Sequence, residues 1–581
     1  MKKYIVTVIL LLSISWSFSQ TVDTARFRVA YNPRLLDFKK INEKAQIKDT
    51  VNQQVKFNYY INAQRTDVTF KPAIIKYNKV APDVLDKMYR NFLKIGFGYP
   101  ITPLLEFSFH NLQNQKYSYG INVHHYSYWA PPIGKTMKQY PNHPSSDTKA
   151  HLHFKRFFKH QTLYSAIDYS HQAARLYGFY KEDFPNYHKD SLKNNFHHLK
   201  AVVGLASNYV LEEKKLKQDA RLTYDFLYTN WKDMENHLGV NTYFAYDARW
   251  AKISGYQQYR FNFNFDYYNN QWDDALLSSK QRHSNAFLIN PEIMAHFNIK
   301  EYHILVGIGG TIDVNYHKVG GTVYPIAELQ LGIVPSILSI YAGVNGDAKH
   351  NSLKELLYEN PFIRPHLDTV CTTTNYINIY GGVKGNLVKK LNYNIGARYS
   401  YSRNLPFYCI DVNSEKLNQY IVEYHNGNTL NVNLTMDYEV IKDLHLNLAA
   451  NYWLYVLTNK RATPYYKPVF ELAFNGSYVL KEKFIFDLNF GLGFGSKALV
   501  PNGDRTEFVV KTMKPILDFG LGFEYRINDH FSAFASINNI ACQHYAKYYD
   551  FKSFGINALV GITYAFGSDS VKLNKGGKAG K

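Results

Sequence analysis

Residues 484–494 read FIFDLNFGLGF. Aromatic and aliphatic side chains take every second position from Phe484 to Phe494. From Asp487 onward the positions between them hold Asp487, Asn489 and two glycines. A repeat of two residues places the two sets on opposite faces of a β-strand. This stretch therefore predicts a strand with one apolar and one polar face.

The same alternation recurs at 261–267, 430–439, 517–525 and 554–566. Two architectures fit this pattern. A soluble sandwich would bury the apolar faces against a second sheet. A transmembrane barrel would turn them toward lipid and keep the polar faces inside its lumen.

Three features favour the barrel. The polar positions are rich in Asn, Gly, Asp and Ser, which suits a wet interior, and Tyr and Phe recur near the predicted strand ends, where interfacial girdles lie. Tight turns also alternate with long connections, as expected for the two sides of an outer-membrane barrel. The turns are 388–391, 440–442, 480–482 and 525–530, and the long connections are 345–376, 404–428, 496–511 and 539–553. We expect an all-β, antiparallel transmembrane barrel of about 20 to 22 strands over residues 91–566.

Composition excludes several other classes. The chain has 581 residues, 46% of them hydrophobic, with a mean hydropathy of −0.35. After the first 19 residues it has no run of about 18 apolar residues of the kind that spans a bilayer as a helix. The 67 Lys and Arg exceed the 47 Asp and Glu, giving a charge of +20. These basic residues are spread through turns and loops without a nucleic-acid-binding motif. We therefore expect no nucleic-acid partner.

The two ends of the chain indicate export. Residues 1–19 combine Lys2 and Lys3 with an apolar stretch and small residues before a cut at Gln20, which predicts a cleaved signal peptide. Residues 20–90 are predicted to form a short extended segment, periplasmic or luminal. The last strand ends on Phe566, resembling the terminal signal of outer-membrane barrels. Residues 567–581 are expected to be a disordered basic tail, and the expected location is the outer membrane.

A family resemblance rests on three stretches. MYRNFLKIGFG at residues 88–98, TPLLE at 102–106 and YGINVHHYS at 119–127 resemble the first barrel strands of TonB-dependent-receptor-like proteins. More narrowly, they are similar to a shorter, plugless branch of such barrels. The resemblance implies an outer-membrane barrel, and for full receptors it implies energised import of bulky nutrients. Residues 20–90 lack a recognisable plug, so the resemblance leaves energised import in doubt and admits a role as a subunit of a larger assembly.

Candidate chemistry is sparse. His151 and His153 lie two apart on a predicted strand, so they share a face and, with His124 or His160, could hold a transition metal. Polar luminal or interfacial histidines explain the same pattern more simply. His125 and Ser127 echo the His-x-Ser of a lipid A deacylase, but the sequence offers no oriented base or oxyanion site. We expect no catalytic residue, no metal and no cofactor, and thus no enzyme.

Three cysteines are too few for a disulfide scaffold. Cys371 and Cys409 lie in two long loops expected to be neighbours outside the cell. A disulfide between them suits an oxidising compartment, although it would leave Cys542 unpaired. Sequence alone does not fix the pairing.

The favoured function is passage of a solute across the outer membrane, in the manner of a porin or receptor. The alternative is a structural or accessory subunit of an outer-membrane assembly or transport complex. The residues expected to face the lumen are Arg398, Asp437, Asp487 and Asn489. Neutralising Arg398 or Asp437 should alter conductance only if the barrel conducts. Expected partners are outer-membrane lipid, lipopolysaccharide and other envelope proteins, because basic interfacial residues complement anionic headgroups.

Overall fold

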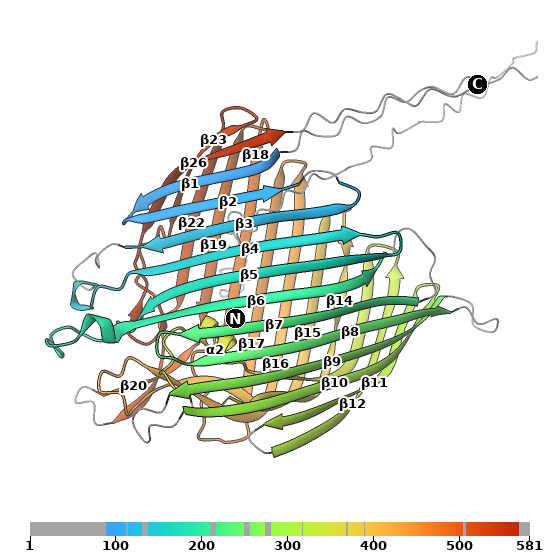
Figure 1. The fold of residues 1–581 in the computed structure, drawn as a ribbon, viewed down its shortest axis with the longest axis horizontal. Coiled ribbons are helices and arrows are strands. Elements are labelled where there is room, and N and C mark those ends of the chain that lie inside the picture. The colour runs from blue at the N-terminus through green and yellow to red at the C-terminus, as the bar shows by residue number, and fades with distance from the viewer. Residues whose placement is uncertain are drawn as a thin grey trace, which may run out of the picture. The chain divides into compact units, whose positions relative to one another are not determined.

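A computed structural model of the chain describes residues 89–111, 114–129, 137–208, 216–248, 256–273, 281–315, 318–367, 370–388, 390–502 and 507–568. Within these ranges no helix is long and apolar enough to cross a membrane. The predicted signal peptide, nearly all of the 20–90 segment and nearly all of the C-terminal tail lie outside the described residues. Figure 1 shows that the described chain is built almost entirely of long strands that wrap around a lumen.

Twenty-two strands form one antiparallel sheet. The sheet closes on itself because the first strand pairs with the last, from Tyr89 opposite Ser568 to Tyr99 opposite Ala558. The strands are β1 Tyr89–Tyr99, β2 Thr102–His110, β3 Tyr117–Tyr128, β4 Ser145–Phe157, β5 Gln161–Arg175, β6 Lys193–Ser207, β7 Leu216–Thr229, β8 Met234–Ala248, β9 Tyr256–Asp273, β10 Gln281–Ile299, β11 Tyr302–Asn315, β12 Lys318–Val334, β13 Leu338–His350, β14 Thr372–Leu387, β15 Leu391–Ile410, β16 Tyr420–Ile441, β17 Leu444–Leu457, β18 Phe470–Leu480, β19 Phe484–Phe494, β22 Ile516–Arg526, β23 Phe531–Asn538 and β26 Asn557–Ser568.

The predicted fold class is confirmed, and the strand number lies at the upper end of the predicted range. Residues 484–494 form strand β19, whose partners are β18 and β22. Every strand is antiparallel to both neighbours, so closure leaves the sheet without a free edge at its ends.

Alternation explains why these segments form a membrane wall. On β7, Leu222 and Tyr224 are 49% and 42% exposed, whereas Thr223 and Asp225 between them are buried. The exposed set faces outward, and the buried set faces the lumen and its contents. The same outward apolar face continues on other strands, for example at Ile308 and Val560, which are 55% and 61% exposed.

Most connections at one rim are short turns, and the longest connections lie at the other rim. The short-turn rim includes 388–390, 442–443 and 481–483, and both ends of the barrel lie there. This rim is therefore periplasmic and the long-loop rim extracellular. Two expected loops proved shorter than the sequence indicated. Strand β15 continues to Ile410 and β16 begins at Tyr420, so most of 404–428 is strand, and β13 and β14 likewise extend into 345–376.

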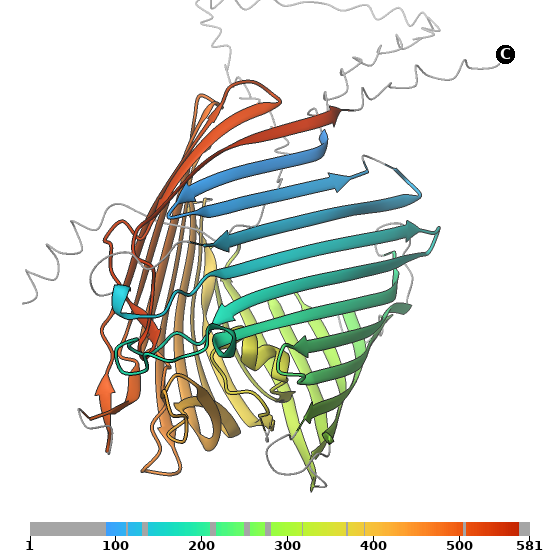
Figure 2. The same cartoon turned by 60° about the vertical axis from the view of Figure 1, so that its left-hand side comes forward.

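The extracellular connections carry small elements of their own. They contain helix α2 Leu353–Glu359, the 3-10 turns Met137–Gln139 and Lys189–Leu192, and two short hairpins. The hairpins are β20 Lys497–Pro501 with β21 Phe508–Thr512, and β24 Ala546–Tyr548 with β25 Phe551–Lys552. Figure 2 shows α2 inside the ring of strands rather than on its outer surface.

The long connections share one apolar core, which we call the cap. Tyr140, Tyr420 and Tyr548 are almost fully buried in it, although each lies more than a hundred residues from the next. Tyr140 Oη donates to Asp550 Oδ1 over 3.1 Å, and Tyr420 Oη donates to the Tyr549 carbonyl over 3.0 Å. The buried members of the cap are Tyr140, Tyr177, Phe196, Leu227, Leu353, Leu356, Leu357, Ile363, Leu367, Val370, Tyr408, Cys409, Ile410, Tyr420, Tyr465, Tyr466, Ala498, Val500, Tyr548 and Phe551.

Candidate functional site: a luminal helix anchored to the barrel wall

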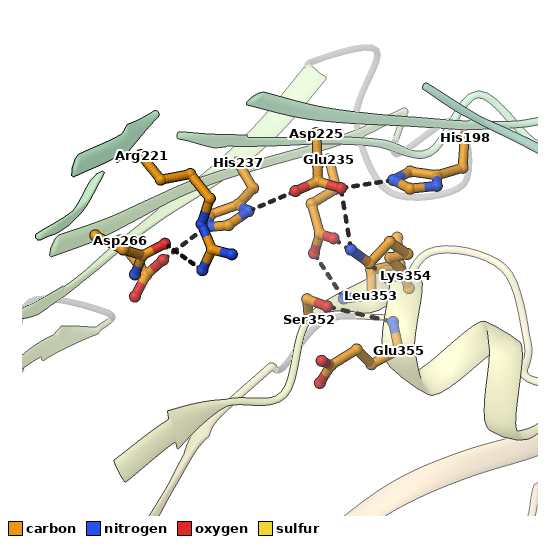
Figure 3. A network of polar contacts seen from close by, with 11 residues as sticks. His198, Arg221, Asp225, Glu235, His237, Asp266, Ser352, Leu353, Lys354 and Glu355 are labelled. Carbon is orange, nitrogen blue, oxygen red and sulfur yellow. Dashed lines mark hydrogen bonds and ion pairs between the residues drawn. The ribbon is translucent and has the colours of Figure 1, made fainter. Parts of the chain in front are cut away.

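The connection between β13 and β14 folds into the barrel and carries α2 to the inner face of strands β7 and β8. Ser352 caps the helix, since its side chain accepts from the Glu355 amide over 3.2 Å. Leu353, Leu356 and Leu357 turn into the cap. The opposite, polar side of the helix meets β7 and β8 (Figure 3). One short helix thus links the cap to the wall.

Asp225 on β7 is the centre of this link. Its Oδ1 lies 2.8 Å from His198 Nε2 and 3.1 Å from Lys354 Nζ, while its Oδ2 lies 3.0 Å from His237 Nδ1. The Asp225 side chain is only 6% exposed. A buried carboxylate with three such partners is strongly attached to each of them. Strands β6, β7 and β8 are therefore joined to α2 through one residue (Figure 3).

His237 is held at both ring nitrogens. Its Nδ1 contacts Asp225, and its Nε2 lies 2.9 Å from Asp266 Oδ1 on β9. Ionised carboxylates only accept hydrogen bonds, so both nitrogens must carry a proton. The ring is thus a cation placed between two anions, and it stacks on Tyr268 with centroids 4.3 Å apart.

Glu235 on β8 receives the start of the helix. Its two carboxylate oxygens accept from the Leu353 and Lys354 amides over 2.6 and 3.2 Å, and the residue is 3% exposed. A carboxylate at the first turn satisfies amides that have no partner inside the helix. Nearby, Arg221 Nη2 donates to Asn241 Oδ1 over 3.1 Å. The polar groups here are occupied by each other, which suits attachment rather than bond-making chemistry.

Ser352, the residue that precedes α2, provides a test with a smaller expected effect on the stability of the helix. Ser352→Ala should destabilise α2 by about 1 kcal/mol, because the Glu355 amide loses its acceptor. The measurement is hydrogen exchange of peptides covering 353–359, which should lose protection by several-fold. Ser352→Asp keeps an acceptor and should retain the protection. Equal exchange in Ser352→Ala and the parent would contradict the capping role.

The four residues predicted to face the lumen lie on strands β15, β16 and β19, away from α2. The Arg398 guanidinium lies 5.4 Å from the centre of the Tyr380 ring. Asp437 accepts from Asn447, and Asp487 accepts from Ser477 Oγ over 2.8 Å. Asn489 lies opposite Asn475 on β18 and Gly520 on β22. Their luminal role remains a prediction.

The histidines singled out in the sequence have ordinary partners. His151 Nδ1 lies 2.5 Å from Asp168 Oδ1, and His125 Nδ1 lies 2.8 Å from Thr148 Oγ1. Ser127 is buried, and its hydroxyl has no hydrogen-bond partner among the described residues. Those residues also contain no group of three potential ligands that could hold a metal ion.

The Cys371–Cys409 disulfide is not formed in the structure, where all three cysteines carry thiols. Cys409 is buried in the cap, on the part of β15 that pairs with Ile421 of β16. The Cys371 carbonyl instead accepts from the Asn351 amide, beside the end of β13. The pairing was expected because both residues were placed in loops. Extension of β15 beyond Asn404 carries Cys409 into a strand away from Cys371.

The α2 anchor was missed by reasoning from sequence. The alternation along β7 and β8 places one set of side chains outward and a more polar set inward. The inward set includes Asp225, Glu235 and His237, so their direction could have been predicted. Their partner Lys354 lies 129 residues from Asp225 and follows no motif. The available signal was a charged residue at an inward position close to the extracellular end of a strand.

The geometry defines a closed 22-strand antiparallel barrel with helix α2 inside it, and its fold is similar to that of TonB-dependent outer-membrane receptors. The structure is similar to the pyoverdine receptor FpvA of Pseudomonas aeruginosa bound to pyoverdine, with a TM-score of 0.62, 10% identity, and coverage of 83% of this chain and 79% of that one. It is also similar to the siderophore receptor PirA of Acinetobacter baumannii, with a TM-score of 0.62, 10% identity, and coverage of 83% and 81%.

A third similar structure is a variant of the ferric enterobactin receptor PfeA from Pseudomonas aeruginosa, with a TM-score of 0.58, 13% identity, and coverage of 83% and 81%. No protein-family model and no curated protein matches the sequence. The resemblance to the receptor-like barrels is therefore confirmed in the fold. The plugless detail concerns residues outside the described part of the chain.

Proposed function

We propose that this protein is an outer-membrane barrel that passes a solute through its lumen by gated, receptor-like transport. The observation that carries the proposal is the cap with its luminal helix. A passive pore needs a continuous water path, whereas loops from around the extracellular rim here bury one apolar core. The buried charges that hold α2 give this closure a defined position. A gate of this kind suits passage that a ligand or partner must trigger.

Planar-bilayer conductance tests the gate. Replacing residues 353–359 with a Gly-Ser linker of equal length removes the apolar face of α2 and Lys354 together. We expect the purified parent to conduct little and the replacement to conduct several-fold more. The matched control replaces residues 183–189 in the β5–β6 connection with the same linker, since most of that segment is exposed. This control should conduct like the parent.

The alternative, a structural or accessory subunit, also draws support from the cap, because a docking barrel functions with its lumen closed. Conductance separates the two functions. If neither the α2 replacement nor neutralisation of Arg398 or Asp437 changes the conductance, the transport proposal fails and the accessory role leads. A parent that already conducts freely would contradict the gate.

We infer that lipid and lipopolysaccharide contact the outer wall. The outward parity on β5 and β6 is apolar at Ile167, Leu199 and Val203, which are 41–50% exposed. Toward the extracellular rim the same parity turns to His171 and His197, whose rings stack at 4.4 Å. This change from apolar to polar side chains suits the boundary between acyl chains and headgroups.

A further inference from the structure

The wall of the barrel is not uniformly paired. Strands β11 and β12 pair along their whole length, from Tyr302 opposite Leu331 to Asn315 opposite Lys318. Strands β12 and β13 pair over only seven positions, from Val334 opposite Leu338 to Ala327 opposite Val344. Beyond Ala327, toward the extracellular rim, the edge of β12 that faces away from β11 pairs with no described strand. Residues 318–326 therefore form a free edge inside a closed barrel.

The upper part of β13 lies on the inner side of β12 instead of beside it. Tyr324 of β12 points inward, where its hydroxyl lies 3.3 Å from Glu292 Oε1. A Cβ built at Gly346 of β13 would lie 2.6 Å from Cγ of that Tyr324 ring. Gly346 thus lets β13 cross directly over the ring. Farther on, His350 reaches Tyr268 of β9, with ring centroids 4.3 Å apart.

A bulge in the β13–β14 pairing accompanies this inward bend. The register shifts between Asn345 and Asp347. Asn378 of β14 donates to the side chains of both residues over 3.0 Å. Bulges bend and twist a strand locally. Beyond the bend, β13 leads directly into the connection that carries α2.

A cavity of about 460 Å³ adjoins the free edge, between it and the next part of the wall, and extends over Thr311, Asp313 and Asn315 of β11. Its lining includes Gly320 and Gly321 of β12, Thr374 and Tyr376 of β14, and Arg403 of β15. A strand placed in the wall between β12 and β14 would pass through this position. The cavity is therefore the place that the upper part of β13 would occupy if the β12–β13 pairing continued.

The free edge begins too low to lie wholly above the membrane. A transmembrane strand needs about 9–11 residues, and the paired part of this joint has only seven positions. On the free part, Val319 and Val323 are 75% and 73% exposed. Backbone N–H and C=O groups without a hydrogen-bond partner are strongly disfavoured in hydrocarbon, so lipid is a poor covering for this edge. A strand that supplies hydrogen bonds is the fitting occupant.

A second copy cannot supply that strand. Two barrels in one membrane are related by an axis along the membrane normal, so their β12 strands run in the same vertical direction. Each strand tilts by about 35–45°, so the two would cross rather than pair. The upper part of β13 has the required antiparallel direction. Continuing the register from Ala327–Val344 would place Val323 opposite Ala348.

We propose that residues 345–350 of β13 alternate between two positions: the inner position of this structure, and a wall position paired with the free edge of β12. In the inner position the segment holds α2 across the lumen. In the wall position it closes the edge, releases the Tyr268 and Tyr324 contacts, and draws the α2 connection away from Glu235. This inference deepens the proposed function, because the same movement seals the wall and opens the lumen.

Disulfide trapping tests the wall position in native outer membranes. The background carries Cys371→Ser and Cys542→Ser and retains the buried Cys409. Val323→Cys/Ala348→Cys should form a disulfide under mild oxidation, detected by mass spectrometry of the linked peptides. Ala327→Cys/Val344→Cys, at the last paired position, is the positive control. Val319→Cys/Ala348→Cys, four residues out of register, should give little product.

Gly346→Ala should increase the linked fraction several-fold, because its Cβ would displace β13 from the Tyr324 ring. Heat-dependent mobility on gels verifies that each variant is a folded barrel. Linkage at 327–344 without linkage at 323–348 would overturn the proposal. So would a product joining position 323 to another protein, which would assign the edge to a partner strand.

Formation of the disulfide between positions 323 and 348 does not depend on whether the barrel transports a solute. If 323–348 links but the linked barrel and the α2 replacement both fail to conduct, the two positions of β13 stand and the transport proposal fails. If the α2 replacement conducts and 323–348 never links, transport stands and the movement of β13 fails.

Discussion

Asp225→Ala is expected to weaken the attachment of α2 by about 3–5 kcal/mol, the range for breaking a buried ion pair by removing one partner. The change leaves Lys354 and two histidines close together without the carboxylate that joins them. The Lys354 ammonium and the His237 ring then lose the carboxylate that compensates their charge, and water or movement of α2 is needed to relieve them. Hydrogen exchange of peptides covering 353–359 measures the effect as lost protection.

Two variants sharpen that experiment. Asp266→Asn removes the negative charge of one partner of His237 but leaves the contacts between Asp225 and α2, so its effect on the helix should be smaller. Glu301→Gln changes an exposed carboxylate in the β10–β11 turn and should have none. The role of Asp225 would be refuted if all three variants exchange like the parent. In a bilayer, Asp225→Ala should also raise conductance.

The cap should loosen as the pH falls from about 6.5 to 4. His143 lies in the β3–β4 connection, 2% exposed, with its ring stacked on Tyr177 at 3.7 Å and on Phe554 at 4.6 Å. Burial lowers the pKa of His143 from 6.5 to about 4, and the Pro141 carbonyl only partly offsets this effect. The folded cap therefore binds this proton less readily than an opened cap does.

The direction of this pH effect follows from the thermodynamic linkage between proton binding and stability. Because the folded pKa is depressed, the stabilisation is fully present above pH 6.5 and is lost as the pH falls through about 4. A shift of this size corresponds to about 3 kcal/mol, or roughly a hundredfold in protection factor. Hydrogen exchange of cap peptides at a series of pH values measures this loss of protection, after correction for intrinsic exchange rates.

His143→Phe provides the matched control for pH. The variant keeps an aromatic ring between Tyr177 and Phe554 but cannot take up a proton. Its cap should lose much less protection between pH 6.5 and 4. A second acid-sensitive contact remains in it: although burial acts to raise the pKa of Glu359, Lys467 Nζ at 2.6 Å holds that pKa below its usual value. A parent whose cap protection is independent of pH would contradict the role of His143.

The wall of this protein could be predicted from sequence, and the contents of its lumen could not. Alternation at 484–494 is a local property, so residues a few positions apart suffice to identify β19 and its polar face. The anchor depends on Lys354 meeting Asp225 across the barrel, which neither residue's neighbours encode. The extension of β15 through Phe407 to Ile410 was also missed from sequence. These side chains are buried, with Tyr408 to Ile410 packed in the cap, so they do not show the alternation of a strand that faces lipid on one side.

The cap has a consequence for biogenesis. Tyr548 and Phe551, which lie in its core, belong to the connection between β23 and β26, the last to be synthesised. Tyr140, from the second extracellular connection, bonds to Asp550 of that same connection. Contacts between such distant parts of a chain form late in folding. The extracellular mouth therefore cannot be completed until the final hairpin is in place, and a barrel stalled before that step would leave the envelope with an unfinished opening.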